Sequence, residues 1–416
     1  MVGTCSNLNN FNSSLFRWSV VKKGRAVGRY LDDWRNDNSI YFDPGHCAYH
    51  MDSSILNNFL GPLILSAAVS SAVTALIVKY GKKLKIVDDP RFHKMTKVVH
   101  SQPVPRGGGW PIFMALLVGT IIFMPGYSRI WAVVLATAVL AVVGFLDDRF
   151  SEKISPYARL VVNILAALIV VGAGVGIAYI NNPLGGIVHL DQPRYCFNSH
   201  CVWILADVFA LVWLVGMQNI VGWSSGVDGQ LPGFVIIAAI AMGLLGLRFG
   251  ADPGQAPVII LAAITAGAYL GFLPWNWYPQ KIMPGYGGKS LAGFLLGVLA
   301  ILSVAKVGAL IMVLGLPIID ATLVIIKRLR EGRSPVWGGY EHFHHYLLDR
   351  GWGRRRIALL YWSVSAGLAI LALRLNSSSK YFTMVAVGAF IAGVIWWLHQ
   401  FSTLSKQPDP DSGSKI

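Results

Sequence analysis

The sequence predicts an all-α protein, a polytopic membrane bundle of about 10–11 transmembrane helices. Three observations lead to this prediction. The 416 residues are 54% hydrophobic and only 13% charged, whereas soluble domains carry about 25% charged residues. Apolar runs recur along the chain, and most of them can cross about 30 Å of hydrocarbon as a helix. The runs are continuous rather than alternating, which argues against a transmembrane β-barrel.

Eleven apolar segments are the predicted spans, and each is expected to be helical because backbone groups in lipid must be satisfied within the segment. The second and eighth segments are short. The segments are 59–79, 110–124, 129–146, 157–181, 204–220, 231–249, 256–274, 290–304, 307–325, 357–373 and 381–399.

Basic residues indicate the orientation of these spans. Lys and Arg are concentrated in 80–109 and 326–356 and are sparse in the loops of the opposite side. With an odd number of spans, the N-terminus is then outside and the C-terminus inside. The loops predicted to face the cytoplasm are 80–109, 147–156, 221–230, 275–289 and 326–356.

The net charge of +15 is explained mostly by these loops and by anionic lipid headgroups, so no nucleic-acid partner is expected. Cys196 and Cys201 lie in a predicted outside loop, where a disulfide is one option. Residues 51–404 are interpreted as one membrane domain. Residues 1–50 are polar and are interpreted as a disordered extension or a misassigned start, and 405–416 as a disordered cytoplasmic tail.

Two adjacent carboxylates, Asp147 and Asp148, end the third apolar run in GFLDDRF. Each Asp costs about 2.5–3.5 kcal/mol at the centre of a membrane helix. The pair therefore marks a place where a metal ion or a cationic side chain binds, although an acidic helix end that simply leaves the membrane would also read this way.

Two further cytoplasmic loops combine glycines with polar side chains. The segment 88–109 carries Lys97, His100 and Arg106, which are candidate phosphate contacts ahead of three glycines. In the segment 217–234 a helix is expected to end at Asn219, and the Gly-rich loop that follows holds Asp228, between two long apolar runs. A flexible basic loop and an ordinary Asp-Gly turn are the simpler alternatives.

His342, His344 and His345 crowd the fourth cluster, 332–356. This spacing without cysteine is a weak zinc signature, and histidines also donate to phosphate oxygens. The GGKS sequence that contains Lys289 is not a phosphate-binding loop of the GxxxxGK[ST] type, because Met283 stands where the first glycine belongs. All the clusters fall on one predicted side, whereas a transporter would carry charges in mid-membrane.

In their order, these motifs resemble the polyprenyl-phosphate N-acetylhexosamine-1-phosphate transferases. The resemblance covers most of 59–373 and is carried by PVPRGGG, GFLDDRF, QNIVGWSSGVDG, FLPWNWYPQKIMPGYGG, GLPIIDATLVIIKRLREGRSP and EHFHHYLLDRG. It implies an enzyme with cytoplasmic active-site loops. The HFHH form is more similar to the branch that transfers N-acetylglucosamine 1-phosphate than to the muramoyl-pentapeptide branch.

The resemblance implies transfer of a sugar 1-phosphate from a UDP-sugar to a polyprenyl phosphate, with release of UMP and with Mg²⁺ or Mn²⁺ as cofactor. By resemblance, Asp147, Asp148 and Asp228 are catalytic and hold the metal. The implied substrate-binding residues are Lys97, His100, Arg106, Asn219, Asn276, Lys289, His342, His344 and His345. The resemblance also implies a prokaryotic inner membrane, and a homodimer is one option.

The chain departs from the family pattern at two carboxylate positions. Ser225 stands where one Asp is usual, and Tyr286 stands where the family has a Mg²⁺ ligand. Gly222 also replaces a usual Asn. The metal is then held by the remaining Asp residues and substrate oxygens, or Lys289 supplies part of the positive charge. The rival interpretations are a catalytically silent relative that binds nucleotide sugar or lipid phosphate, and a transporter.

Overall fold

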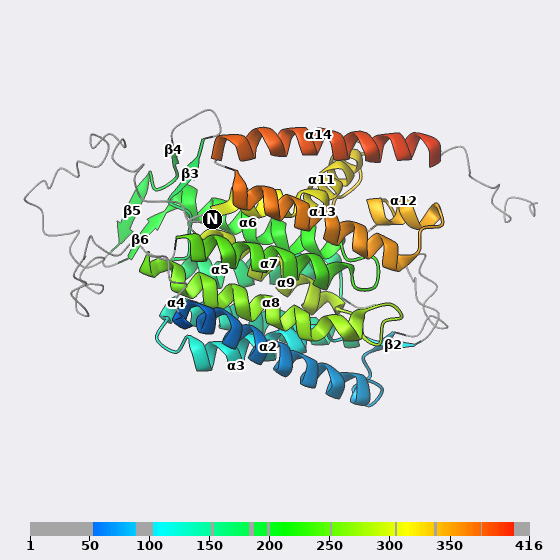
Figure 1. Ribbon diagram of the computed structural model, residues 1–416, viewed down its shortest axis with the longest axis horizontal. Helices are drawn as coiled ribbons and strands as arrows, with labels where there is room; N and C mark the ends of the chain where they lie inside the picture. Colours follow the sequence, from blue (N-terminus) through cyan, green and yellow to red (C-terminus); the bar gives the residue numbers. More distant parts are fainter. Residues whose placement is uncertain are drawn as a thin grey trace, which may run out of the picture. The chain divides into compact units, whose positions relative to one another are not determined.

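The computed structural model describes residues 53–88, 103–150, 154–182, 187–197, 200–249, 252–303, 306–336, 339–375 and 377–402. The chain divides into two units, Met1–Ser53 and Ser54–Ile416. The predicted extension 1–50 and tail 405–416, together with Lys97 and His100, lie outside the described residues. The second unit is a helical bundle with three two-stranded hairpins (Figure 1).

The helices of this unit, in chain order, are α2 (Ser53–Tyr80), α3 (Gly109–Phe123), α4 (Ser128–Arg149), α5 (Pro156–Gly172), α6 (Ile204–Trp223), α7 (Gln230–Arg248), α8 (Ala256–Asn276), α9 (Gly285–Leu302), α10 (Lys306–Val313), α11 (Gly315–Arg330), α12 (Phe343–Asp349), α13 (Arg354–Arg374) and α14 (Ser377–Ser402). A short 3₁₀ turn, η2 (Pro253–Gln255), precedes α8.

The hairpins pair antiparallel strands. They are β1 (Val87–Asp88) with β2 (Val104–Pro105), β3 (Tyr179–Asn181) with β4 (Ile187–His189), and β5 (Arg194–Phe197) with β6 (His200–Trp203). Figure 1 shows β3–β6 at one end of the bundle and β2 and α12 at the other. The register of the last hairpin sets Cys196 opposite Cys201.

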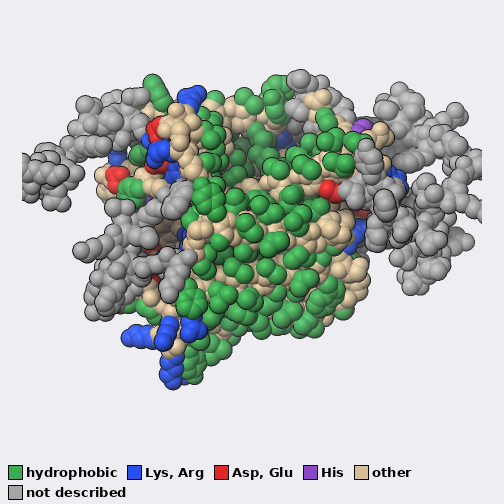
Figure 2. All heavy atoms as spheres, turned by 180° about the vertical axis from the view of Figure 1, so that it is seen from behind, with side chains coloured by type: hydrophobic (Ala, Val, Ile, Leu, Met, Phe, Trp, Pro, Cys, Tyr) green, Lys and Arg blue, Asp and Glu red, His purple; other side chains and the backbone are tan. Residues whose placement is uncertain are grey.

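Every predicted span contains at least one helix, and the chain is an integral membrane protein. Among the described residues, eight helices are long and apolar enough to cross a membrane, or nine if a bent pair counts as one span. The predicted second span is the shorter helix α3. In Figure 2, hydrophobic side chains cover the middle of the face, and charged side chains lie toward its two ends, as expected for a protein surrounded by lipid.

Two predicted helix ends were wrong, and one predicted span is bent. The span 157–181 ends as a helix at Gly172, because Gly174 adopts a left-handed backbone (φ 82°) and the chain continues into β3. The span 307–325 is broken by an 87° bend between α10 and α11. The helix before the Gly-rich loop continues past Asn219 to Trp223.

The centre of the bundle is formed by α7, α8 and α9, whose apolar residues are the most deeply buried of the candidate spans. Helix α8 packs on α7 and α3, and α9 packs on α6 and α4. This core fixes the ends of α4, α6 and α9, which carry the predicted site residues.

Candidate active site

The paired carboxylates lie in the last turn of α4, and both are buried. Asp147 Oδ1 lies 2.6 Å from Nε of Arg159, which comes from the first turns of α5. Asp148 Oδ1 accepts the backbone N–H of Tyr286, at the start of α9, at 3.2 Å. Burial of charge requires such partners, so the pair is held by two other helices.

The first turn of α9 comes so close to α4 that only glycine fits. Gly285 has φ 63°, and a Cβ there would lie 2.2 Å from Asp148 Oδ2. A Cβ on Gly144 of α4 would lie 2.5 Å from Cα of Gly287, and one on Gly109 of α3 would lie 3.0 Å from the same atom. The glycines of PVPRGGG, GFLDDRF and PGYGG therefore bring three backbones into direct contact.

Tyr286 turns its side chain toward α5. Its hydroxyl lies 2.6 Å from Oδ1 of Asn163 and 3.0 Å from the backbone oxygen of Arg159. The guanidinium of Arg159 lies 5.8 Å from the centre of the Tyr286 ring. At the position where the resemblance led us to expect a carboxylate, the chain thus has a phenol that is hydrogen-bonded to a neighbouring helix.

Two more cations act on the carboxylate pair. Arg106, next to the glycines that open α3, forms an ion pair with the buried Asp88 at 2.6 Å. The charges of Arg106 and of Lys289, one turn into α9, act on both Asp147 and Asp148. Arg106 and Lys289, both predicted substrate contacts, therefore lie close to the predicted metal ligands.

Asp228 lies in a loop that is locked from several sides. Its Oδ2 accepts the backbone N–H of Gln280 at 3.3 Å and lies 3.7 Å from Nη1 of Arg354. Asn276 accepts the N–H of Gly229 at 3.1 Å and donates to the backbone oxygen of Ile282 at 2.9 Å. Asn276 therefore acts as a brace between the Asp228 loop and the segment that leads to α9.

The rings of His342, His344 and His345 lie close together in one group, called the histidine cluster below. The rings of His342 and His344 are 5.7 Å apart and nearly parallel, at 4°, and those of His344 and His345 are 4.0 Å apart. His344 lies against Gly226, where a Cβ would come within 1.8 Å of Nε2. Gly226 is thus required for this close approach, whereas Gly229 is the glycine with a left-handed backbone (φ 75°).

His344, which contacts Gly226 in the loop of Asp228, is also close enough to Lys289 for the two to interact electrostatically. Burial, together with the neighbouring His345, His342 and Lys289, lowers the pKa of His344 well below its usual value, so the ring is neutral. Lys289 acts on the carboxylate pair and on His344 alike. The structure therefore brings together three predicted clusters, those of Asp147, of Gly226 and of His344.

Charged side chains lie next to the histidine cluster. Asp320 of α11 is buried and lies 3.0 Å from Nδ1 of His342. Glu341 forms ion pairs with Arg328 at 2.9 Å and with Arg333 at 2.6 Å. Burial alone would raise the pKa of Glu341, but the hydrogen bonds from Arg333 and Arg328 outweigh it and lower that pKa to about 2.

The side chains of Asn219 and Ser225 form hydrogen bonds to the backbone at the end of α6. The amide of Asn219 donates to the backbone oxygen of Val215 at 2.8 Å, and the hydroxyl of Ser225 donates to that of Gly222 at 2.6 Å. Among the described residues, no three His, Cys, Asp or Glu side chains form a group that could hold a metal ion. The metal roles of Asp147, Asp148 and Asp228 stay predictions.

Sequence reasoning missed Arg159, Asn163 and Asp320 as parts of the site. In the sequence, Arg159 stands out only as a cation near the carboxylate pair. Asn163 and Asp320 stand alone among apolar residues of α5 and α11, and a polar side chain in a membrane span is itself a signal.

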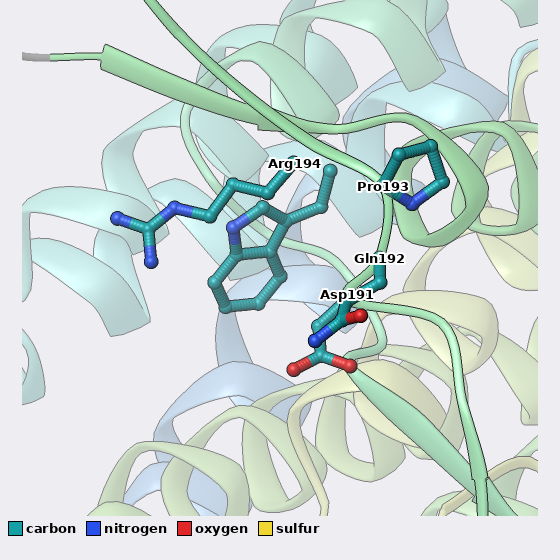
Figure 3. A pocket seen from close by; sticks show the side chains of 5 residues that line it. Asp191, Gln192, Pro193 and Arg194 are labelled. Carbon is teal, nitrogen blue, oxygen red and sulfur yellow. The ribbon is translucent and has the colours of Figure 1, made fainter.

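Two surface pockets are lined by other residues. One of about 220 Å³ is lined by Asp191, Gln192, Pro193, Arg194 and Trp203, near the β5–β6 hairpin. Figure 3 shows the guanidinium of Arg194 pointing away from Asp191 and Gln192, so this pocket does not gather charge of one sign. The other, a groove of about 270 Å³, is lined by residues of α6, α10 and α11 and is almost wholly apolar.

Known proteins are similar to this chain over most of its length. The model of glycosyl transferase family 4 matches residues 130–304. The chain is 24% identical over 331 residues to a probable undecaprenyl-phosphate N-acetylglucosaminyl 1-phosphate transferase of Bacillus subtilis, covering 78% of this chain and 87% of the relative. It is 27% identical over 366 residues to the decaprenyl-phosphate N-acetylglucosaminephosphotransferase of Mycobacterium leprae, covering 80% and 86%. A phospho-N-acetylmuramoyl-pentapeptide-transferase of Moorella thermoacetica is 26% identical over 331 residues, covering 76% and 98%.

Proposed function

Because residues 130–304 of the chain belong to glycosyl transferase family 4, we propose that this membrane protein transfers a sugar 1-phosphate from a UDP-sugar to a polyprenyl phosphate. The product is a polyprenyl-diphosphate sugar for cell-envelope polysaccharide synthesis. An oxygen of the lipid phosphate attacks the sugar-bearing phosphorus of the nucleotide sugar. A new P–O bond forms, the bond from that phosphorus to the UMP oxygen breaks, and UMP leaves with the electron pair.

The observation that carries this proposal is that three cationic side chains lie near two buried carboxylates. Asp147 pairs with Arg159, and Arg106 and Lys289 act on both carboxylates. Attack of one phosphate on another brings several negative charges together, and fixed positive charges stabilise such a transition state. In this proposal Arg106 and Lys289 bind phosphate oxygens, and Asp228 with Asn276 lies on the nucleotide side.

The donor set at the carboxylate pair suits Mg²⁺ that is only partly held by protein. Mg²⁺ often binds through one or two carboxylates and is completed by water and substrate phosphates. Asp147 and Asp148 are adjacent and have one oxygen each beyond the bonds to Arg159 and Tyr286. When bound there, the ion would neutralise charge on the transferring phosphoryl group, and Mn²⁺ would serve the same purpose.

The apolar groove along α6 suits the polyprenyl chain. Its lining includes Phe209, Trp213 and Ile220 of α6 and Ile311 and Ile318 on the two sides of the bend between α10 and α11. Ile220 lies in the last turn of α6, just ahead of the loop that carries Asp228. A lipid tail in this groove would bury apolar surface while its phosphate points toward the charged end.

The sugar, the membrane and the assembly are finer parts of the proposal. Relatives of both branches have similar identity, 27% and 26%, so the preference for N-acetylglucosamine rests on the HFHH sequence. The proposed location is the prokaryotic inner membrane with the site at the cytoplasmic face, because the basic loops lie at that end. A homodimer, which the resemblance allows as one option, would appear in the mass of the detergent-solubilised particle.

UMP release by the purified protein tests the function. UDP-N-acetylglucosamine and undecaprenyl phosphate are supplied with Mg²⁺ in detergent, and each substrate is omitted in turn. We expect UMP only when both are present, together with a lipid-linked sugar diphosphate. Absence of UMP with every UDP-N-acetylhexosamine, under Mg²⁺ or Mn²⁺, would contradict catalysis, and binding without turnover would indicate a silent relative.

A further inference from the structure

Asp320 is a buried carboxylate for which the proposed reaction has no direct use. It lies on α11, next to the bend, and is 1% exposed. Its Oδ1 accepts the backbone N–H of Phe343 at 2.8 Å, and its Oδ2 lies 3.0 Å from Nδ1 of His342. Both partners, His342 and Phe343, lie at the start of α12, so this one carboxylate binds the histidine cluster to α11.

This contact decides which nitrogen of His342 is left for a ligand. An ionised carboxylate only accepts hydrogen bonds, so Nδ1 of His342 carries a proton. At the cap of α12 the backbone N–H of His345 donates both to the His342 side chain and, at 2.9 Å, to the carbonyl of His342. A protonated Nδ1 cannot accept this N–H, which then keeps its bond to the carbonyl. Nε2 is then the ring atom that remains to meet a ligand.

The ring of His342 is also fixed in orientation. Trp223, at the end of α6, stacks on it with 6.4 Å between ring centres, and His344 stacks at 5.7 Å. The neighbouring His344 lies on Gly226 in the loop of Asp228. With Trp223 and His344 stacked on the ring and Nδ1 bound to Asp320, the ring meets a ligand through Nε2.

We propose that Asp320 is a positioning residue that holds a proton on Nδ1 of His342, so that Nε2, on taking up a proton from solvent as substrate binds, donates it in a hydrogen bond to a phosphate oxygen of the substrate. In this arrangement Asp320 balances the charge of the imidazolium while the phosphate binds. The proposal rests on the proposed function, since it names the group that recognises the diphosphate of that substrate. It goes beyond it by assigning a role to a side chain that does not touch substrate.

The substitution D320N tests this with little change in shape. Its side-chain oxygen can still accept the N–H of Phe343, but its amide NH₂ faces Nδ1 of His342 and can only donate. The neutral ring then carries its proton on Nε2, so it still donates to the phosphate oxygen but without a positive charge. We expect UDP-N-acetylglucosamine, titrated calorimetrically into the full-length protein, to bind about tenfold more weakly, because the donor of this hydrogen bond is no longer charged. D207N, at the other end of α6, is the matched control and should bind as the wild type does.

A double-mutant cycle separates positioning from a general structural role. If Asp320 acts through His342, the variant D320N/H342Q binds no more weakly than H342Q alone. Multiplicative losses, or unchanged affinity in D320N, would overturn the proposal.

Nitrogen NMR of the histidine rings gives a readout that does not depend on turnover. With His342 assigned by its absence from the H342Q spectrum, the wild type should show a proton on Nδ1, and on both nitrogens when nucleotide sugar is bound. A neutral ring with its proton on Nε2 would refute the proposal. If this signature is found while no UMP is ever released, the proposed function fails and the role of Asp320 does not.

Discussion

The hydroxyl of Tyr286 donates to Oδ1 of Asn163 across 2.6 Å and ties the first turn of α9 to α5. Both residues are polar, and Asn163 is buried in an apolar helix. The same helix carries Arg159, whose guanidinium pairs with Asp147 and lies near the Tyr286 ring. Tyr286 is therefore integrated into the site through α5, although it is not a carboxylate.

Tyr286→Phe should destabilise the protein by about 1–3 kcal/mol, because Oδ1 of Asn163 is left buried without its donor. Thermal unfolding in detergent measures this. Tyr157→Phe is the control, since Tyr157 is exposed and its hydroxyl lies 3.4 Å from that of Ser334. Equal unfolding temperatures for Tyr286→Phe and the wild type would show that the bond to Asn163 does not stabilise the fold.

Asp147→Asn and Asp148→Asn should each lower kcat about 10²–10³-fold, the loss typical when preorganised charge stabilisation is removed. The measurement is UMP release at saturating substrates. Asp207→Asn changes a carboxylate that accepts the N–H of Trp203 outside the site, and it should keep wild-type activity. Near-normal turnover in both site variants would mean that the pair is not part of the reaction.

Gly226→Ala should lower kcat/KM strongly while the protein stays folded. The new Cβ would come within 1.8 Å of Nε2 of His344, so the histidine ring must move, and a displacement of about 1 Å in an active site can cost about 10²-fold. Gly367→Ala is the matched control, because a Cβ at Gly367 of α13 meets nothing within 4 Å. Full activity in Gly226→Ala would show that His344 has no fixed place in catalysis.

Glu341→Gln should lower the unfolding temperature at pH 7 and should lessen its dependence on pH in acid. The folded-state pKa of Glu341, about 2, is below the ordinary value of 4.5. Its contribution is therefore fully present above pH 4.5 and is lost as the pH falls toward 2. Glu331→Gln, at a side chain that is 43% exposed, is the control. The proposed contribution of Glu341 is contradicted if Glu341→Gln lowers stability by the same amount at pH 7 as at pH 3 and by no more than Glu331→Gln does.

Chelation by EDTA should abolish UMP release, and added Mg²⁺ should restore it. The reason is that Asp147 and Asp148 together provide few protein donors, so the ion would be weakly held and exchangeable. The restored rate is measured against Mg²⁺ concentration, and Ca²⁺ serves as a comparison ion. Full activity in EDTA would assign the charge stabilisation to Arg106, Arg159 and Lys289 without a metal.

Some of the site could be predicted from sequence because charge near a membrane is costly. Asp147 and Asp148 stand out at the end of an apolar run, and His342, His344 and His345 stand out by crowding. The contacts between distant segments could not be predicted in this way. Nothing local to Asn163 or Asp320 indicates that their partners are Tyr286 and His342, since these pairs depend on how the helices pack.

The helical fold followed from hydropathy, but two of its details did not. The end of α5 depends on the left-handed backbone of Gly174, which a window of apolar residues hides. The bend between α10 and α11 occurs within a continuous apolar stretch that composition reads as one span. Hydropathy measures whether a segment can enter lipid, and it says little about whether the segment stays straight.

The contact of Gly144 and Gly109 with Gly287 has a consequence for how this protein can move during a catalytic cycle. Helices whose backbones touch cannot slide past each other without collision, and they have no side chains there to rearrange. The parts of α3, α4 and α9 that meet at these glycines are therefore expected to keep their relative positions. The movements that admit a nucleotide and a lipid in turn must come from segments that contact the site through side chains, above all the segment of His342.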